Sequence, residues 1–325
     1  MFLAVIMFLV GFLLLIKGGD WFVDGAVGIA HRFNLPELLI GATVVSIGTT
    51  LPEVMVSAQA ALQGNSGISY GNAIGSIICN TALIAAITIA VRPAPVKRDT
   101  ILLPVTAFFA AALFYCAIAY TTGQFQRWHG IVLLGMFLVY MFYSVKKMKS
   151  GDSNDAAPEE AAPEKKEESS LMKELLMLVV GAIAIAFGAN LLVENGTIIA
   201  SALGVPDSVI GLTMVALGTS LPELITAITS LRKGIGAMSL GNVIGANLFN
   251  LVLVSGTAIT ISPFAVPSEK LIAGMNSSLI VDIPVMLGVM IILCFPAVFK
   301  EKLFKWQGYL LLGIYVLFTI YQFVM

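Results

Sequence analysis

Long apolar runs, each separated from the next by a short polar segment, dominate the chain. A helix needs about 20 apolar residues to cross the hydrocarbon core of a bilayer. Runs of about this length or longer recur from one end of the chain to the other. The pattern predicts an all-α membrane protein with ten transmembrane helices, at residues 2–31, 37–63, 68–92, 99–121, 128–147, 171–200, 207–232, 237–261, 276–299 and 303–324.

One polar segment divides the ten runs into five and five. Residues 151–170 hold seven of the chain's 19 acidic residues and no aromatic residue. This composition is typical of a solvated, disordered linker. We therefore predict a first five-helix half at 1–148, a linker at 149–170 and a second half at 171–325.

Basic residues predict the orientation in the membrane. With the N-terminus outside, 15 lysines and arginines fall in inside segments, whereas Arg127 and Lys270 fall outside. Lysine and arginine accumulate on the cytoplasmic side of membrane proteins. The distribution predicts a multi-pass protein of the cell (inner) membrane, with both termini outside and the linker in the cytoplasm.

Composition supports a membrane protein and excludes several other classes. The 325 residues are 58% hydrophobic and 11% charged, whereas soluble domains carry about 25% charged residues. The net charge of −1 argues against a nucleic-acid partner and leaves the lipid bilayer as the main environment. No HExxH motif is present and both histidines lie at the edges of predicted loops, so we do not expect an enzyme. The sequence leaves the oligomeric state open.

Two motifs recur, and both copies are separated by the same offset in residue number. GATVVSIGTTLPE at 41–53 matches GLTMVALGTSLPE at 211–223, and GNAIGSIICN at 71–80 matches GNVIGANLFN at 241–250. Without gaps, 21 of the 61 positions from 36 to 96 are identical to their counterparts. Five spans separate the copies, so the second copy enters the membrane from the opposite side. Such inverted-topology repeats are typical of secondary transporters, which bind substrate near the midplane and open alternately to each side.

A glutamate ends the first motif in each copy. Glu53 and Glu223 lie within apolar runs, where an ionised carboxylate is costly unless it faces a cavity, a cation or a proton. Each follows a proline, Pro52 or Pro222, which lacks an N–H group and therefore leaves an upstream carbonyl without its helical donor. We expect a broken or kinked helix whose carbonyl groups line an ion site.

Further oxygen atoms accompany each glutamate, although serine and threonine hydroxyls can also simply bond to their own helix. Amide oxygens at the end of the second motif lie at a depth where an unpaired amide is costly. One further hydroxyl has an alanine as its counterpart, at Ala246. The candidate ligands beside the two glutamates are Thr49, Thr50, Thr219, Ser220, Asn80, Asn250 and Ser76.

Two carboxylates among neutral oxygen atoms suit hard cations such as Ca²⁺ and Na⁺. Cys79 lies beside this set, but its counterpart is Phe249, and we expect it to contribute packing alone. Two negative charges balance one Ca²⁺ or are shared by Na⁺ ions or protons, and such competition for one site favours exchange. The same carboxylates can carry protons, so H⁺/Ca²⁺ antiport stays open as the alternative. We expect transported ions and no cofactor.

At these motifs the sequence resembles the calcium/cation antiporter superfamily, in particular its prokaryotic sodium/calcium exchangers. GTTLPE at 48–53 and GTSLPE at 218–223 look like the paired repeats of that family. The resemblance implies Na⁺-driven Ca²⁺ export, with ions held between helices 2, 3, 7 and 8. It also implies that helices 1 and 6 slide across this core.

Carried over by position, the glutamates resemble ligands shared by Ca²⁺ and Na⁺, and the carbonyl groups of Thr49 and Thr219 resemble the remaining Ca²⁺ ligands. The carbonyl groups of Ser46 and Ala216 resemble donors to flanking Na⁺ sites. The resemblance gives the other side chains secondary roles: Thr50, Ser220 and Ser76 assist at the Na⁺ sites, and Asn80 and Asn250 form a central polar pair.

Three further acidic residues lie in or near the predicted spans. Asp24 and Glu194 are equivalent under the offset of the repeat, and each fits an ion entrance or a solvated helix end equally well. Asp282 has no counterpart, and the sequence assigns it no role.

Overall fold

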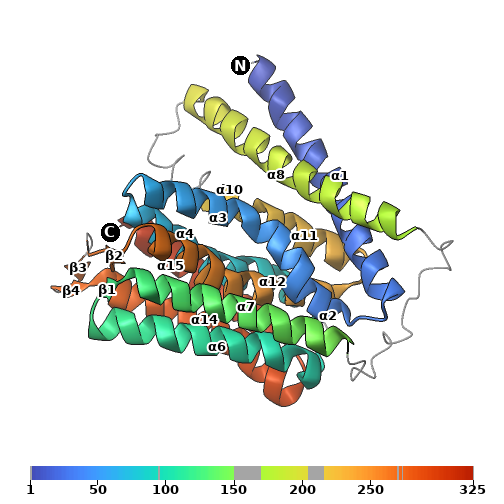
Figure 1. The fold of residues 1–325 in the computed structure, drawn as a ribbon. Helices are drawn as coiled ribbons and strands as arrows, with labels where there is room; N and C mark the ends of the chain where they lie inside the picture. Colours follow the sequence, from blue (N-terminus) through green and yellow to red (C-terminus); the bar gives the residue numbers. More distant parts are fainter. Residues whose placement is uncertain are drawn as a thin grey trace.

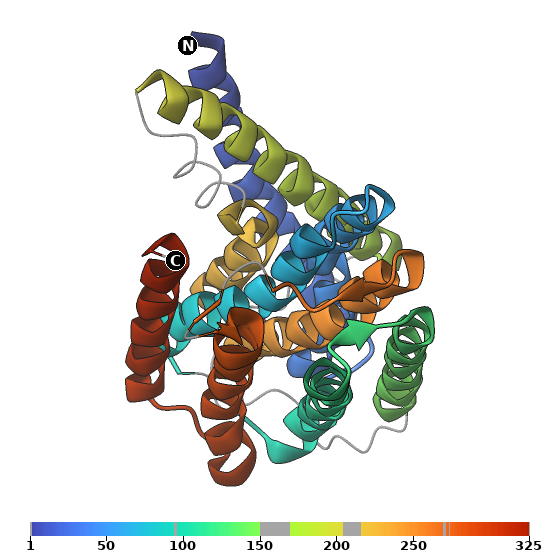
Figure 2. The same ribbon diagram turned by 90° about the vertical axis from the view of Figure 1, so that its left-hand side faces the viewer.

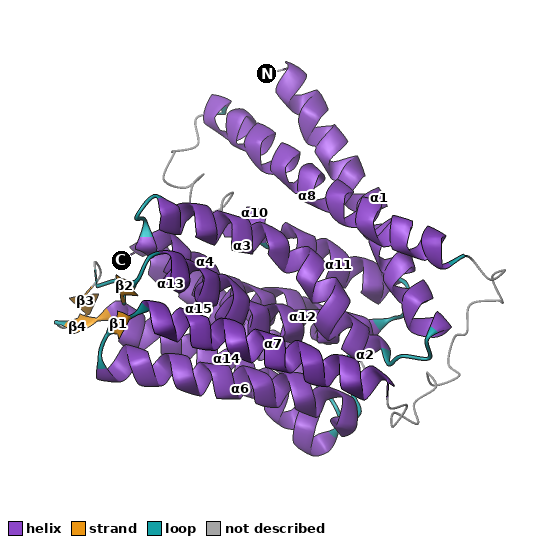
Figure 3. Ribbon diagram, in the orientation of Figure 1, coloured by secondary structure: helices purple, strands orange, loops and turns teal. Residues whose placement is uncertain are grey.

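A computed structural model describes residues 2–93, 96–149, 170–203, 216–268, 271–272 and 274–324. Helix dominates throughout these residues (Figure 3). Eight of the described helices are long and apolar enough to cross a membrane. The predicted linker at 149–170 lies almost entirely outside the described residues, as does the start of the predicted span at 207–232.

The described helices follow the apolar runs to within a few residues at most ends. Several consist of two or three segments, because short π-helical turns (η) interrupt the α-helix. In chain order the segments are α1 Phe2–Arg32, α2 Glu37–Ile40, η1 Gly41–Val45, α3 Ser46–Leu62, α4 Ser66–Cys79, η2 Asn80–Ala85, α5 Ala86–Val91, α6 Arg98–Thr121, α7 Arg127–Lys149, α8 Leu171–Ala202, α10 Ala216–Thr219, α11 Leu221–Arg232, α12 Gly236–Phe249, η4 Asn250–Ser255, α13 Gly256–Ile261, η5 Ser278–Asp282, α14 Ile283–Lys300 and α15 Lys305–Val324.

Four two-residue strands lie in the loops. β1 (Gln124–Phe125) pairs antiparallel with β2 (Phe264–Ala265), and β3 (Leu271–Ile272) pairs with β4 (Met275–Asn276). The first pair joins the loop after α6 to the segment after α13. The strands connect helix ends without forming a layer of their own.

Helix boundaries recur at the offset of the sequence motifs. Both ends of α4, η2 and α5 are equivalent under this offset to those of α12, η4 and α13, and the end of α3 is equivalent to the end of α11. The repeat therefore extends from the sequence into the backbone. The number of spans and their opposite orientations in the membrane stay predictions.

The helices form two bodies. α1 and α8 lie side by side and run obliquely across one face of the remaining helices (Figures 1 and 2). The motif-bearing helices α3, α4, α11 and α12 contact one another beneath this pair. α6, α7 and α14 lie on the far side of the motif helices from α1 and α8 (Figure 1).

Glycines allow α1 and α8 to approach at the backbone level. A Cβ atom on Gly11 would lie 2.8 Å from the carbonyl oxygen of Gly188, and one on Gly18 would lie 3.0 Å from that of Gly181. A Cβ on Gly25 would lie 2.6 Å from the carbonyl oxygen of Glu174. Small residues permit this kind of close packing between membrane helices. The rising number in α1 against the falling number in α8 makes the pair antiparallel.

Ion pairs fasten one end of this helix pair. The Arg32 guanidinium donates to both carboxylate oxygens of Glu174, at 2.9 and 3.1 Å, and joins the end of α1 to the start of α8. The Lys233 ammonium group lies 2.8 Å from the Asp24 carboxylate and 3.8 Å from that of Asp20. The second contact joins α1 to the loop after α11.

A second close approach lies among the motif helices. A Cβ atom on Gly41 or Gly241 would overlap the facing backbone at Met238 or Leu38 respectively, and one on Gly245 would lie 2.6 Å from the Ala42 Cα. The first motif of one copy therefore packs directly on the second motif of the other.

We expect a Gly25→Ala substitution to destabilise the protein by roughly 1–3 kcal/mol, because its methyl group meets backbone rather than a movable side chain. Thermal unfolding of the detergent-purified protein measures the change. Gly313→Ala in α15 is the matched control: nothing described lies within 4 Å of its Cβ, so helix propensity alone predicts a neutral or slightly stabilising effect. Equal melting temperatures for the two variants would refute the tight seam between α1 and α8.

Candidate ion-binding site

π-helical turns begin at the last residue of the second motif in both copies. η2 starts at Asn80 and η4 starts at Asn250. Such turns are rare and are frequent at functional sites. η2 contacts α11 and η4 contacts α3, so each asparagine-bearing turn lies against the helix that carries the glutamate of the other copy.

Side-chain hydroxyl groups donate hydrogen bonds to backbone carbonyl oxygens in the π-helical turns η1 and η4. Ser46 Oγ lies 2.7 Å from the carbonyl oxygen of Gly41 in η1, and Tyr140 donates to that of Ala42 at 2.8 Å. Ser255 donates to the carbonyl oxygen of Asn250 at 3.0 Å. Polar side chains thus compensate the irregular backbone, as a water-poor environment requires.

The two prolines act differently in the two copies. Pro52 lies inside α3, which stays helical from Ser46 to Leu62. Pro222 lies in the first turn of α11, and Ser220 separates that helix from α10 with φ −92° and ψ 3°. Proline is tolerated in the first turn because its missing N–H group has no partner there in any case. The expected broken or kinked helix is therefore a break in the second copy; in the first copy the helix continues through Pro52, and a kink there stays a prediction.

The two glutamates lie close together in the interior. Both Glu53 and Glu223 are 0% exposed, and their carboxyl groups are near enough to interact electrostatically. Within the described part of the chain, none of their four carboxyl oxygens has a hydrogen-bond partner. Two buried carboxylates without donors need a cation or a proton between them.

Other unpartnered polar atoms belong to the same motifs. They are buried and have no hydrogen-bond partner among the described residues, and they include both amide atoms of the two asparagines. Buried polar groups in proteins are almost always hydrogen-bonded, so their concentration at one place marks a site built for a ligand. The side chains concerned are Thr50, Asn80, Ser220 and Asn250.

Asn242 connects the second copy to the first. Its Oδ1 accepts a hydrogen bond from Thr49 Oγ1 at 3.2 Å and lies 3.3 Å from Ser46 Oγ. The Thr49 hydroxyl also lies beside the Glu223 carboxyl group. Asn242 therefore orients a hydroxyl at the site without itself ending the motif.

Asn72, the counterpart of Asn242, works within its own copy. Its Nδ2 donates to the Glu53 carbonyl oxygen at 3.1 Å and to Ser57 Oγ at 2.8 Å. The counterparts of Ser46 and Ser57 are Ala216 and Ala227, which offer no hydroxyl group. The halves therefore share a backbone repeat but differ in hydrogen bonding.

Three further predicted ligands lie on α4 and α10. Ser76 is buried on α4, and Thr219 is half-buried at the end of α10. Ala216 begins α10, and its side chain lies outside the described residues, as do motif residues 211–215.

One polar contact beside the site was missed from the sequence. Asn247 Nδ2 donates to Thr81 Oγ1 at 2.7 Å and lies 3.1 Å from the sulfur of Met290. It joins α12 to η2 directly after Asn80. The only available signal was an asparagine at a position where the first copy has Ile77.

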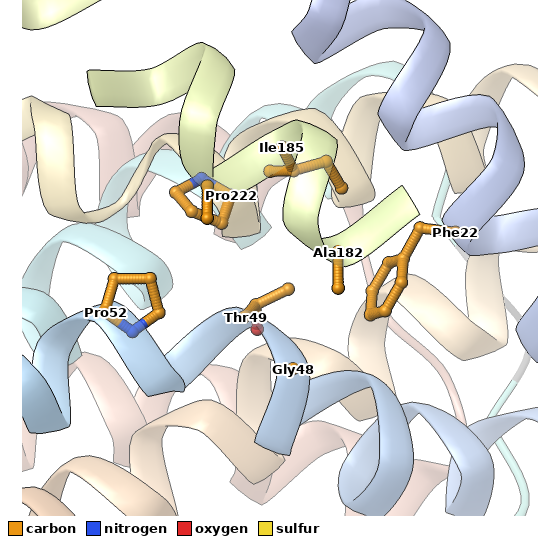
Figure 4. Close-up of a pocket in the computed structure, with 8 residues that line it drawn as sticks. Phe22, Gly48, Thr49, Pro52, Ala182, Ile185 and Pro222 are labelled. Atoms are coloured by element: carbon orange, nitrogen blue, oxygen red, sulfur yellow. The ribbon is translucent and has the colours of Figure 1, made fainter. Parts of the chain in front are cut away.

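A small cavity separates the site from the α1 and α8 pair. Gly48, Thr49 and the two motif prolines line it on one side; Phe22, Ala182, Ile185 and Ala186 line it on the other (Figure 4). Thr49 points into the space between the two bodies (Figure 4).

The three acidic residues to which the sequence gives no single role lie away from the unpartnered atoms of the motifs. Asp24 pairs with Lys233, Glu194 is exposed on α8, and Asp282 accepts a hydrogen bond from Gln322 at 3.1 Å. Among the described residues, no group of three or more His, Cys, Asp or Glu side chains is placed to hold a metal ion. Any cation at the motifs must therefore be held by the carboxyl pair together with neutral oxygen atoms, the donors that hard cations prefer.

Comparisons with known proteins agree with this architecture. A family model described as sodium/calcium exchanger protein matches residues 3–146 and 173–324. The sodium/calcium exchanger MaX1 of Methanosarcina acetivorans is 31% identical, with 97% of each chain covered. An uncharacterized membrane protein of Methanocaldococcus jannaschii is 35% identical, with 95% of each chain covered.

A solved structure of the sodium-calcium exchanger NCX_Mj, soaked with Na⁺ and Sr²⁺, is also similar. It superposes with a TM-score of 0.80 at 34% identity and covers 97% of both chains. With the family model matching both halves around the linker, the chain belongs to the sodium/calcium exchanger family.

Proposed function

We propose that this protein is a secondary antiporter that exchanges Na⁺ for Ca²⁺ across the cell membrane by alternating access. The observation that carries the proposal is the buried pair Glu53 and Glu223, whose carboxyl oxygens lack donors among the described residues. Two formal negative charges balance one Ca²⁺, or are shared by Na⁺ ions. The sodium/calcium exchangers among the similar proteins support Na⁺ and Ca²⁺ as the two transported ions.

In this proposal the ions bind between four helical segments. These are Glu37–Leu62, Ser66–Val91, 216–232 and Gly236–Ile261, the second, third, seventh and eighth in chain order. The contacts of η2 with α11 and of η4 with α3 support a site to which both copies contribute.

Around the glutamates, the carbonyl groups of Thr49 and Thr219 complete the Ca²⁺ site, and those of Ser46 and Ala216 serve the flanking Na⁺ sites. For Thr49 the support is its burial and its hydrogen bond to Asn242, which joins it to the second copy of the repeat. The side chains that assist are Thr50, Ser76, Ser220, Asn80 and Asn250.

We propose the inverted arrangement for the two halves, 1–148 and 171–325, with the linker at 149–170 in the cytoplasm and both termini outside. The helix bounds that recur at the offset of the motifs support two equivalent halves. The hydrogen bonds from Arg32 to Glu174 bring the end of α1 next to the start of α8, and this proximity supports assigning both ends to the same side of the membrane.

Neutralising either glutamate tests the site. We expect Glu53→Gln and Glu223→Gln each to weaken Ca²⁺ binding by at least about tenfold, because one of the two charges that balance the cation is lost. Na⁺-gradient-driven ⁴⁵Ca²⁺ uptake into proteoliposomes, together with calorimetric Ca²⁺ binding, measures the effect. Glu194→Gln is the matched control on an exposed position of α8. Wild-type uptake by both site variants would refute the assignment.

The choice of counter-ion is tested by separate gradients. Proteoliposomes loaded with Na⁺ at equal pH on both sides should accumulate Ca²⁺, whereas a pH gradient in choline buffer should not. Protonation of the same carboxyl pair is the physical basis of the alternative. Uptake driven by the pH gradient alone would replace the proposed function with H⁺/Ca²⁺ antiport.

A further inference from the structure

Two bulky apolar side chains of α1 and α8 lie on the glycines of the first motif. A Cβ atom on Gly48 would lie 2.9 Å from Phe22 Cζ, and one on Gly218 would lie 2.6 Å from Val193 Cγ2. Each contact exists only because the motif residue has no side chain. Phe22 comes from α1 and Val193 from α8, so each helix of the pair supplies one side chain that covers a motif glycine. We call these two side chains the covers.

Phe22 is held firmly in place over the site. It is 1% exposed, and a Cβ on Gly181 of α8 would lie 2.5 Å from its backbone nitrogen. Its ring borders the same cavity as Gly48 and Thr49 (Figure 4). Because Pro52 has no N–H group, the Gly48 carbonyl lacks its helical donor, and the ring therefore packs on a residue whose carbonyl oxygen is available to an ion.

The two covers lie toward opposite ends of the helix pair. Phe22 lies in the half of α1 that ends at Arg32, and Val193 lies in the half of α8 that ends at Ala202. Because α1 and α8 are antiparallel, these ends point in opposite directions. An ion passing either cover would leave toward a different side.

We propose that Phe22 and Val193 are the two gate side chains of this transporter, each closing the ion site toward one side of the membrane by seating on Gly48 or Gly218. The inference rests on the proposed transport function and adds to it the residues that control access. In this structure both covers are seated. Transport then requires the pair of helices to lift one cover while the other stays on its glycine.

A native thiol offers a test that needs no transport. Cys79 is 6% exposed and lies beside Ser220, near both glutamates. With Cys116 and Cys294 replaced by alanine, it is the single cysteine of the chain. Its rate of modification by a small, charged methanethiosulfonate reagent, measured by mass spectrometry in sealed proteoliposomes, reports whether the site is open to water.

We expect Phe22→Ala to accelerate modification by at least about tenfold, because truncating a buried phenylalanine costs the closed state several times the energy that a tenfold change needs. The acceleration should appear with the reagent on one side only, and Val193→Ala should produce it from the other side. Phe12→Ala and Val179→Ala remove exposed side chains from the same helices and should leave the rate unchanged.

The reaction is run in choline chloride without Na⁺ or Ca²⁺, so it stands apart from the ion assignment. Phe22→Leu and Val193→Leu keep an apolar cover, so Cys79 in these variants should react at close to the rate seen with Phe22 and Val193 in place. This result would show that altered folding does not cause the acceleration in the alanine variants. Equal acceleration from both sides, or none in the alanine variants, would overturn the gate assignment. In that case, loss of transport in the Glu53→Gln and Glu223→Gln variants would still support the ion site, because the two proposals are tested separately.

Discussion

Two carboxyl groups held together in a protein interior, away from any described hydrogen-bond donor, impose the constraint on which the other features depend. Glu53 and Glu223 are fully buried, and like charges in a medium of low polarity repel strongly. The fold tolerates them only where a positive charge can enter. The prolines beside them serve the same need, since a carbonyl group that has lost its helical donor offers a further oxygen atom to a cation.

Much of this architecture was predictable because its signals are local. Runs of apolar residues set the helix bounds, and the constant offset between the two copies of each motif anticipated the backbone repeat. Glu53, Glu223, Asn80 and Asn250 could be singled out because charged and amide groups are costly among apolar neighbours. In the described part of the chain, every carboxyl and side-chain amide atom of these four residues is buried without a hydrogen-bond partner.

Other features depend on contacts between distant segments, which a single sequence does not encode locally. The bond from Thr49 to Asn242 joins the two halves of the chain, and the contact of Phe22 with Gly48 depends on how α1 crosses α3. The π-turns gave no sequence signal beyond the motif itself. The sequence left open whether each proline breaks or kinks its helix, and α3 continues through Pro52 because proline can remain within a helix when packing supports the turn around it.

The glycine seam between α1 and α8 has a mechanical consequence. Helices in backbone contact at Gly11, Gly18 and Gly25, and tied at one end by Arg32 and Glu174, cannot slip past one another without overlap. The two helices are therefore expected to move together as one rigid body about 46 Å long, from 31 residues at 1.5 Å each. A push at one end, whether from an ion, a lipid or a substitution, therefore arrives at the other end as a displacement of the same body.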